Sequence, residues 1–185
     1  LTIDVQLQCG DLPRGLQIGR ITEQVSRLLL ESRPAVMVVQ GDTNTVLGAA
    51  IAANACEVPL AHVEAGLRSH DRAMPEEHNR VLVDHLADVL FAPTQHCRRN
   101  LLQENIAGEI VVSGNTELDA LKMLLPPSSE RLRVLRQYGL YENSYAVVTI
   151  HRPENTDDRA NLSYIVESLE QLSLPCLFVL HPRTA

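Results

Sequence analysis

Short apolar runs alternate with segments of helical periodicity along the whole chain. The runs are rich in Val, Leu and Ile, and they fall at 35–39, 58–63, 89–92, 109–112, 145–150 and 176–180. Such near-continuous runs are typical of strands that are buried on both faces of a parallel sheet. The segments that predict helices fall at 18–29, 46–55, 80–87, 96–102, 118–125, 132–138 and 161–172. This alternation predicts an α/β fold with parallel sheets built from right-handed βαβ units.

A cluster of turn-forming residues, Pro-Pro-Ser-Ser at 126–129, divides this pattern in two. We therefore expect most of one α/β unit over 1–125, a linker and helix over 126–144, and the beginning of a second α/β unit over 145–185. The chain does not begin with Met, opens in an apolar alternation and stops directly after a strand-like run. These features predict a part of a longer protein that has been shortened at both ends.

The composition argues against several classes of protein. The chain has 185 residues, a net charge of −7 and 3% aromatic residues with no Trp. We do not expect such an acidic chain, without a basic cluster or stacking aromatics, to bind nucleic acid or anionic lipid. No apolar run approaches the roughly 18 residues that a membrane span needs. The cysteines lie far apart without a C-x-x-C pair or zinc spacing, which favours a reducing, cytoplasmic location and predicts no metal site.

Polar or charged residues follow almost every predicted strand. Asp42, Glu64, His151 and His181 all stand just after an apolar run. Ligands bind beyond the carboxyl ends of the strands in open α/β sheets, so these residues predict a rim lined with acid–base groups and cations. The chain has neither a G-x-G-x-x-G fingerprint nor a P-loop, which argues against a dehydrogenase or a kinase. Acid–base chemistry on a small anionic substrate fits these residues better.

The first two candidate acids also have structural interpretations. Asp42 stands where its carboxylate could cap the following helix. Glu64 directly follows a buried run and precedes Ala-Gly, so we expect it to be partly desolvated and suited to proton transfer, unless it pairs with Arg68 or Arg80. If the strand continues, His62 points to the same sheet face as Glu64. The apolar neighbours of His62 favour a supporting role in the core.

Two further pairs are equally open. Glu76 and Glu77 fall at the start of a predicted helix, where acids simply oppose the helix dipole. His151 and Arg152 could donate charge-assisted hydrogen bonds to an oxyanion such as phosphate. The alternative is a histidine that caps a helix or bridges to Glu154.

Seven motifs, read together, resemble one family. They are GDTNT at 41–45, HVEAGLRS at 62–69, MPEEHNR at 74–80, DHLAD at 84–88 with FAPT at 91–94, GNT at 114–116, HRPEN at 151–155 and HPRT at 181–184. In this order and near this spacing they resemble the non-hydrolysing UDP-N-acetylglucosamine 2-epimerases of bacteria and archaea, from about Leu16 to the last residue. The hydrolysing epimerases share the fold and the chemistry, but their pattern departs from HVEAGLR and PEE-x-NR and fits less well.

The resemblance implies a GT-B-like fold of two Rossmann-like domains with the substrate in the cleft between them. It implies interconversion of UDP-N-acetylglucosamine and UDP-N-acetylmannosamine. In the family mechanism the C2 proton is removed and UDP is eliminated, which leaves a bound 2-acetamidoglucal, and UDP then adds back. The resemblance implies no cofactor and no metal, and a homodimer of the parent protein.

By their positions in the motifs, Asp42, Glu64 and Glu76 correspond to the family's catalytic acids, and His151 to its essential histidine, which helps the departing phosphate. Which carboxylate serves which face of C2 stays open. Arg152 and His181, together with Glu76, match positions that bind a second, activating UDP-N-acetylglucosamine in the bacterial enzymes. The same motifs make Arg80 and Glu77 further candidates for substrate or activator binding.

Two segments of the family pattern do not occur in this chain. One is the opening strand with its G-T/S-R-P-E loop, and the other is a second-domain loop whose Ser and Glu hold the diphosphate and ribose. We therefore expect this chain alone to be inactive. The alternative from another class is a non-catalytic sugar-nucleotide-binding remnant. A GT-B glycosyltransferase fits less well, because it is not expected to combine three such acids with HR-x-EN.

Overall fold

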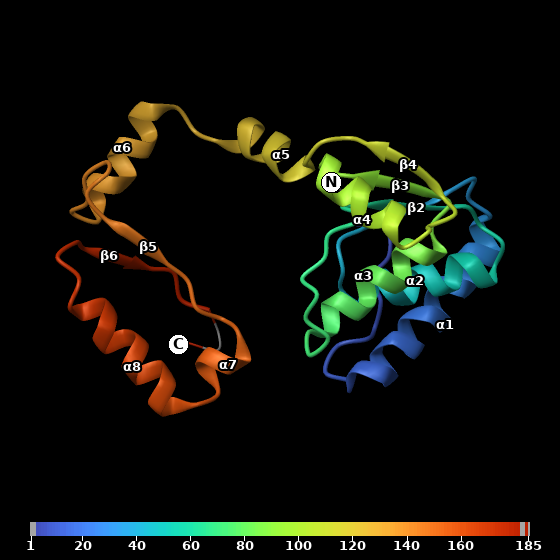
Figure 1. Ribbon diagram of the computed structural model, residues 1–185, viewed down its shortest axis with the longest axis horizontal. Coiled ribbons are helices and arrows are strands. Elements are labelled where there is room, and N and C mark those ends of the chain that lie inside the picture. The colour runs from blue at the N-terminus through green and yellow to red at the C-terminus, as the bar shows by residue number, and fades with distance from the viewer. Residues whose placement is uncertain (1–2, 182–183, 185) are drawn as a thin grey trace. The chain divides into compact units, whose positions relative to one another are not determined.

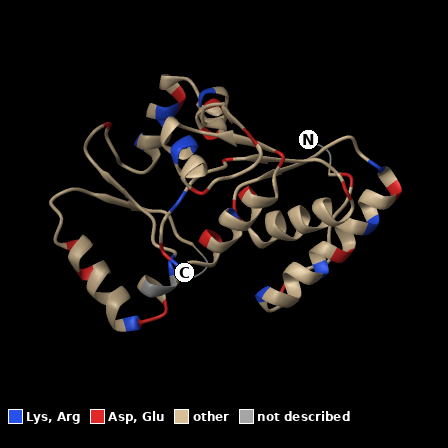
Figure 2. Cartoon of the chain, turned by 45° about the vertical axis from the view of Figure 1, so that its right-hand side comes forward, with Lys and Arg blue, Asp and Glu red and all other residues tan. Residues whose placement is uncertain are grey.

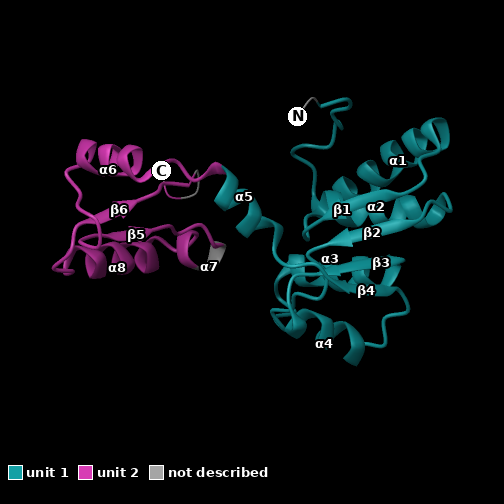
Figure 3. Cartoon of the chain, turned by 90° about the horizontal axis from the view of Figure 1, so that it is seen from above, with its two compact units in different colours: residues 1–123 teal, residues 124–185 magenta. Residues whose placement is uncertain are grey.

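A computed structural model describes residues 3–181 and 184 (Figure 1). The chain forms two units. The first unit runs to Met123 and the second begins at Leu124 (Figure 3). The division falls just before the turn-forming cluster at 126–129. Each unit contains its own parallel sheet, so the α/β class expected from the alternating pattern is confirmed.

The first unit is built on a parallel sheet of four strands in the order β1-β2-β3-β4. The strands are β1 (Met37–Gln40), β2 (Leu60–Val63), β3 (Val89–Ala92) and β4 (Glu109–Val112). The helices are α1 (Arg14–Ser32), α2 (Asn44–Ala55), α3 (Pro75–Leu86), α4 (Gln95–Gln103) and α5 (Thr116–Leu124). Because each of α2, α3 and α4 joins two neighbouring parallel strands, the carboxyl ends of all four strands lie along one edge.

One face of this sheet is covered, and the other is partly open. Right-handed crossovers between strands in sequential order place the connecting helices on the same face, and Figure 1 shows α1, α2 and α3 on one side of the sheet. His62 and Leu90 on the covered face are fully buried, whereas Val38 and Val111 on the other face are 57% and 36% exposed. The expectation that every strand is buried on both faces is therefore wrong.

The core of the first unit is built from α1, α2, α3, α4 and the sheet. The small apolar segment predicted to be buried is α2, and its Gly48, Ala49 and Ala50 are buried against α1. A Cβ atom at Gly48 would lie 2.8 Å from Cγ2 of Ile21. The small residues therefore allow the two helices to approach closely, which fixes α2 and the loop that precedes it.

The second unit contains two short parallel strands and three helices. The strands are β5 (Ala146–Val148) and β6 (Cys176–Phe178), and the helices are α6 (Ser128–Gln137), α7 (Pro153–Thr156) and α8 (Arg159–Glu170). Both strands lie within the apolar runs predicted from the sequence but are shorter than those runs. No described helix is long and apolar enough to cross a membrane. Figure 2 shows residues of both charges on several helices, such as α1, whereas α2 has none.

Candidate functional site

The loop after β1 places Asp42 beside the end of β2. Gly41 adopts a φ of +81°, which favours glycine, and its N–H donates to Val63 O at 3.1 Å. The side chain that caps α2 belongs to Thr43, whose Oγ1 accepts from Val46 N at 3.4 Å. The interpretation of Asp42 as the helix cap is therefore wrong. Its carboxylate instead forms an ion pair with Arg80.

Glu64 occupies the turn that ends β2. Its φ of +73° bends the chain out of the strand, and Gln40 Nε2 donates to its Oε1 at 2.9 Å. Gln40 and His62 stand on opposite faces of the sheet according to the strand register. Glu64 therefore does not share the face of His62, because the strand ends at Val63 rather than continuing.

The Glu64 carboxylate lies close to the loop that carries Asp42. A Cβ atom built on Gly41 would lie 3.9 Å from Glu64 Oε2. The two arginines that could have neutralised Glu64 are engaged elsewhere: Arg68 pairs with Asp84 and Glu104, and Arg80 pairs with Asp42 and Glu77. The structure thus places Asp42 and Glu64 at adjacent strand ends. Asp42 is paired with the Arg80 cation, and Glu64 accepts from the neutral amide of Gln40.

Glu77 is buried at the start of α3 and holds the preceding loop. Its carboxylate accepts from the N–H groups of Ser69 and His70, each at 2.9 Å, from Ser69 Oγ and from Arg80 Nη1, the last two at 3.0 Å. Burial by itself raises the pKa of Glu77, but these hydrogen bonds and the Arg80 charge outweigh burial and lower it below its ordinary value. Glu76, by contrast, is exposed in the same first turn.

Asn79 is a buried residue of this site that the sequence reasoning did not single out. It is 1% exposed, its Nδ2 donates to Asp42 O at 2.8 Å, and its Oδ1 accepts from Arg14 Nη2 at 2.7 Å. Asn79 therefore fixes the backbone of Asp42 while Arg80, one residue further along, holds the side chain. The available signal was the pair Asn79–Arg80 one helical turn after Glu76 in the PEEHNR motif.

His62 and Asp84 form a second buried group behind the two acids. Their atoms Nδ1 and Oδ1 are 2.7 Å apart, and both side chains are completely buried. Asp84 also pairs with Arg68, which binds Glu104 through two further hydrogen bonds. Burial lowers the pKa of Arg68, but Glu104 and Asp84 more than offset that effect and raise it well above its ordinary value. The core role expected for His62 agrees with this burial.

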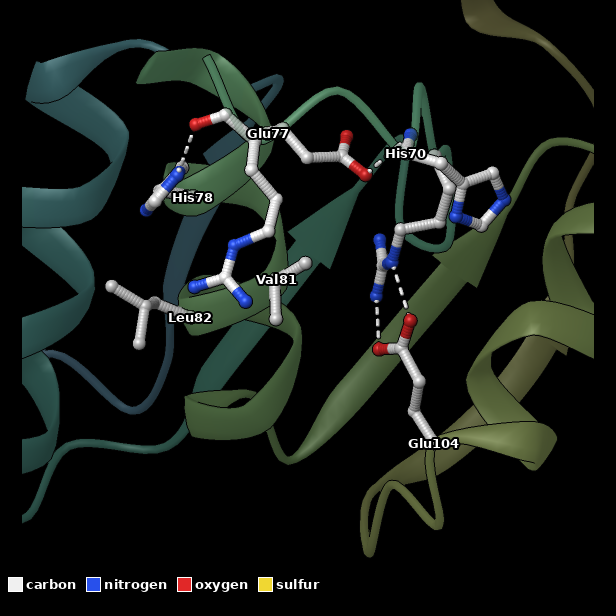
Figure 4. A pocket seen from close by; sticks show the side chains of 8 residues that line it. His70, Glu77, His78, Val81, Leu82 and Glu104 are labelled. Carbon is white, nitrogen blue, oxygen red and sulfur yellow. Dashed lines mark hydrogen bonds and ion pairs between the residues drawn. The ribbon is translucent and has the colours of Figure 1, made fainter. Parts of the chain in front are cut away.

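A pocket of about 490 Å³ lies beside α3, and Glu77 and His78 are among the residues that line it (Figure 4). Val81 and Leu82 supply apolar lining, and Glu104 lines it with its hydrogen bonds to Arg68. Asp42, Glu64 and Glu76 are not among its lining residues. Asp42 and Glu64 at the strand ends and Glu76 in the first turn of α3 therefore all lie outside this pocket.

In the second unit, the predicted histidines meet where β5 and β6 end. The ring centroids of His151 and His181 are 5.6 Å apart with the rings tilted by 41°. The carbonyl of Arg152 accepts from Asn155 N and Thr156 N at 3.0 and 3.2 Å and so begins α7. This unit therefore gathers His151, Arg152 and His181 at the carboxyl edge of its own sheet. The bridging interaction of His151 with Glu154 concerns a side chain outside the described residues.

Carboxylates gather at the strand ends of the first unit, and imidazole rings gather at those of the second. Asp42 and Glu64 offer two carboxylates of different surroundings, and the imidazole rings at the end of β5 and β6 offer donors for a phosphate. Across the described parts of the chain, no group of three or more His, Cys, Asp or Glu side chains is placed to hold a metal ion.

Comparison with known proteins relates the chain to one family over its full length. A family model described as UDP-N-acetylglucosamine 2-epimerase matches residues 1–185. A UDP-N-acetylglucosamine 2-epimerase of Methanocaldococcus jannaschii is 42% identical over 185 residues, covering 96% of this chain and 50% of the relative. A UDP-2,3-diacetamido-2,3-dideoxy-D-glucuronate 2-epimerase of Pseudomonas aeruginosa is 37% identical over 187 residues, covering 98% of this chain and 51% of the relative.

A solved structure supports the same relationship. The crystal structure of the M. jannaschii UDP-GlcNAc 2-epimerase in complex with UDP-GlcNAc and UDP matches with a TM-score of 0.84 and 40% identity, covering 100% of this chain and 52% of that one. The chain thus spans about half the length of the relatives that it matches. The family match over residues 1–185, together with the fold and the ordered motifs, shows that this chain belongs to the UDP-N-acetylglucosamine 2-epimerase family.

Proposed function

We propose that the protein carrying this chain interconverts UDP-N-acetylglucosamine and UDP-N-acetylmannosamine. The observation that carries the proposal is the pair of carboxylates at adjacent strand ends: Asp42 follows β1, Glu64 follows β2, and Glu64 Oε2 lies beside Gly41. Inversion at C2 needs one group that removes a proton and another that returns a proton to the opposite face. Membership of the family supports a UDP-sugar as the substrate.

The proposed bond changes balance without an oxidant or a reductant. A carboxylate takes the C2 proton, the electrons of that C–H bond form a C1=C2 double bond, and the C1–O bond breaks as UDP leaves with its electron pair. The oxygen of UDP then adds back to C1 of the bound 2-acetamidoglucal, and an acid delivers a proton to the other face of C2. Asp42, Glu64 and Glu76 are the candidates for these proton transfers.

The surrounding residues have distinct proposed tasks. Arg80 orients the Asp42 carboxylate through their ion pair, and Glu77 fixes Arg80 through a second ion pair. In the second unit, His151 assists the departing phosphate, and Arg152 and His181 contact phosphate oxygens of the substrate or of a second, activating UDP-N-acetylglucosamine. Their common place at the strand ends of one sheet supports these assignments. A homodimer is the proposed assembly of the whole protein.

A second substrate deserves a direct comparison because of one relative. The P. aeruginosa protein that is 37% identical is named for a 2-epimerase acting on UDP-2,3-diacetamido-2,3-dideoxy-D-glucuronate. That reaction also inverts C2, so it needs the same two proton transfers. The two candidates differ at C3 and C6 of the sugar, and kinetics with both UDP-sugars will distinguish them.

The proposed function is tested by replacing Glu64 in the full gene product that carries this chain. Proton NMR of the anomeric signals follows the conversion of UDP-N-acetylglucosamine. We expect Glu64→Gln to lower turnover at least about 100-fold, because a proton-transfer group is lost while size and polarity are kept. The matched control is Glu31→Gln at the exposed end of α1, which should leave turnover unchanged. Near-normal turnover by Glu64→Gln would refute the assignment of Glu64.

The same assay separates an enzyme from a binding remnant. An enzyme converts the substrate, whereas a remnant binds UDP-sugar in a titration but gives no product. Running the 185-residue chain beside the full gene product also tests the expectation that this chain alone is inactive. Turnover by the 185-residue chain would show that expectation to be wrong.

A further inference from the structure

A buried hydrogen-bond network lies directly behind Asp42 and Glu64, and the proposed reaction does not use it. Its two central residues, His62 and Asp84, have no exposed surface. His62 uses both ring nitrogens: Nδ1 lies 2.7 Å from Asp84 Oδ1, and Nε2 lies 2.9 Å from Gly41 O. Burial of so many polar groups is weak support for a role in stability alone, because apolar side chains often fill such space equally well.

The partners of His62 determine where its hydrogens lie. A carbonyl oxygen can only accept, so Nε2 carries a hydrogen and donates to Gly41 O. Asp84 also accepts from Gly66 N at 3.0 Å and from Arg68 Nη1 at 2.8 Å, so its carboxylate acts as an acceptor in this network. The short contact with Asp84 is then a hydrogen bond donated by Nδ1. Both ring nitrogens of His62 are therefore assigned as donors, Nε2 to Gly41 O and Nδ1 to Asp84 Oδ1.

The Asp84 carboxylate holds the chain on both sides of Glu64, through the side chain of His62 and the backbone N–H of Gly66. Its Oδ1 accepts from His62, two residues before Glu64, and its Oδ2 accepts from Gly66 N, two residues after Glu64. Glu64 itself has a φ of +73°, a conformation that costs a non-glycine residue free energy and persists only where the surroundings enforce it. The two hydrogen bonds from one buried carboxylate supply that enforcement.

The other end of the network holds the backbone of Asp42. His62 Nε2 donates to the carbonyl of Gly41, and that peptide group joins Gly41 to Asp42. On the opposite side of Asp42, Asn79 Nδ2 donates to the carbonyl of Asp42 itself. One imidazole ring thus connects the segment before Asp42 to the carboxylate that holds the segment around Glu64.

We propose that His62 and Asp84 are positioning residues that set the separation and orientation of the Asp42 and Glu64 carboxylates. The inference rests on the proposed function, in which these two carboxylates act on the same carbon. Neither residue contacts the substrate, since both are fully buried. Their loss should therefore reduce the rate of the chemical step and leave substrate binding almost unchanged.

Two substitutions of His62 separate its two contacts. The amide nitrogen of glutamine overlies Nε2 of histidine, so His62→Gln keeps the donor to Gly41 O and loses the donor to Asp84. The amide nitrogen of asparagine overlies Nδ1, so His62→Asn keeps the donor to Asp84 and leaves Gly41 O without one. If the network positions Asp42 through Gly41, the asparagine variant is the more damaged of the two.

The kinetic test uses the full gene product and counts only folded protein. We expect His62→Asn to lower kcat about 100-fold with KM within about threefold, and His62→Gln to retain kcat within about tenfold. Leu29→Ala is the control, because it removes a core side chain of α1 that lies outside the network. It should lower the unfolding midpoint and leave kcat unchanged. Equal kcat for both His62 variants, or a comparable loss of kcat in Leu29→Ala, would overturn the proposal.

A second measurement does not depend on enzymatic activity. Nitrogen-15 NMR of the histidine rings should give hydrogens on both nitrogens of His62 in the unsubstituted protein. In Asp84→Asn, the new amide donates to Nδ1 and its oxygen accepts from Gly66, so only Nε2 should keep a hydrogen. A hydrogen on one nitrogen alone in the unsubstituted protein would overturn the assigned network. If the protein lacks turnover while the NMR result holds, the proposed function fails and the network stands.

Discussion

Gly66 packs directly on the backbone of Cys97. A Cβ atom at Gly66 would lie 2.4 Å from Cys97 O, and Gly66 has a φ of +81°. The turn that follows β2 therefore rests on the first turn of α4 with no space for a side chain. Because Gly66 N also donates to Asp84 Oδ2, this close packing fixes the position of Glu64, two residues earlier in the chain.

Gly66→Ala is expected to destabilise the protein much more than Gly114→Ala. Both glycines have positive φ, at +81° and +86°, but a Cβ atom at Gly114 meets nothing within 4 Å. The Gly114 variant should lose about 1 kcal/mol of unfolding free energy from backbone strain alone, and the Gly66 variant at least about 3 kcal/mol from strain and overlap. Urea unfolding of the two variants measures the difference. Equal losses of unfolding free energy would mean that the turn at Gly66 can move away from Cys97 without an energetic cost.

Helix α1 offers a stabilising substitution. A Cβ atom at Gly19 meets nothing within 4 Å, whereas one at Gly48 of the facing helix would lie 2.8 Å from Ile21 Cγ2. Gly19→Ala should therefore raise the unfolding free energy by about 0.5–1 kcal/mol, because glycine is a poor helix former. Gly48→Ala should lower it. Thermal unfolding of the pair checks the two signs, and a gain in both variants would contradict the packing between α1 and α2.

Glu77 makes stability depend on acidity. Its pKa is lower in the folded protein than in the unfolded chain, so its contribution is present above the unfolded value of about 4.3 and is lost as pH falls through the folded value. Glu77→Gln should therefore cost stability near neutral pH, with the cost shrinking as the pH falls below about 4. Glu76→Gln is the matched control at the adjacent, exposed position. The unfolding free energy of each variant is compared with that of the unsubstituted protein across pH 3–8. This difference should depend on pH for Glu77→Gln and stay nearly constant for Glu76→Gln.

The guanidinium group of Arg80 bridges two carboxylates. It pairs with Asp42 and with Glu77, and its side chain is 14% exposed. Lysine has a single ammonium group, so Arg80→Lys should lose one of the two contacts and cost about 1–3 kcal/mol of unfolding free energy. The control is Arg27→Lys, because Arg27 pairs with Glu23 on the surface at 74% exposure and should cost less than about 0.5 kcal/mol. Similar costs at both positions would contradict a stabilising role of the two ion pairs of Arg80.

The sequence pattern located the strands because burial imposes a local composition. Each of the six apolar runs overlaps a strand, and 109–112 and 89–92 match β4 and β3 residue for residue. The pattern did not reveal which faces are covered. Which face is covered depends on the side of the sheet on which each connecting helix packs. The hydrophobicity of a single strand does not encode that side, so the pattern does not predict the exposure of Val38.

Candidate residues were found where the chemistry is local and missed where it is long-range. Asp42 and Glu64 follow apolar runs, so the carboxyl-edge rule brought them together correctly. The left-handed backbone of Glu64 was not predicted, because it is enforced by Asp84, twenty residues away in the chain. The sequence leaves open whether Asp42 caps α2, since Asp and Thr are both good caps, and the structure shows that Thr43 is the cap while Asp42 pairs with Arg80.

The proposed reaction inverts C2 by removing and returning a proton. The most direct test incubates the full gene product with UDP-N-acetylglucosamine in deuterium oxide and examines the product by NMR and mass spectrometry. We expect UDP-N-acetylmannosamine that carries deuterium at C2, because the returned proton comes from a carboxyl group in exchange with solvent. A product that retains the original hydrogen at C2 would contradict this expectation.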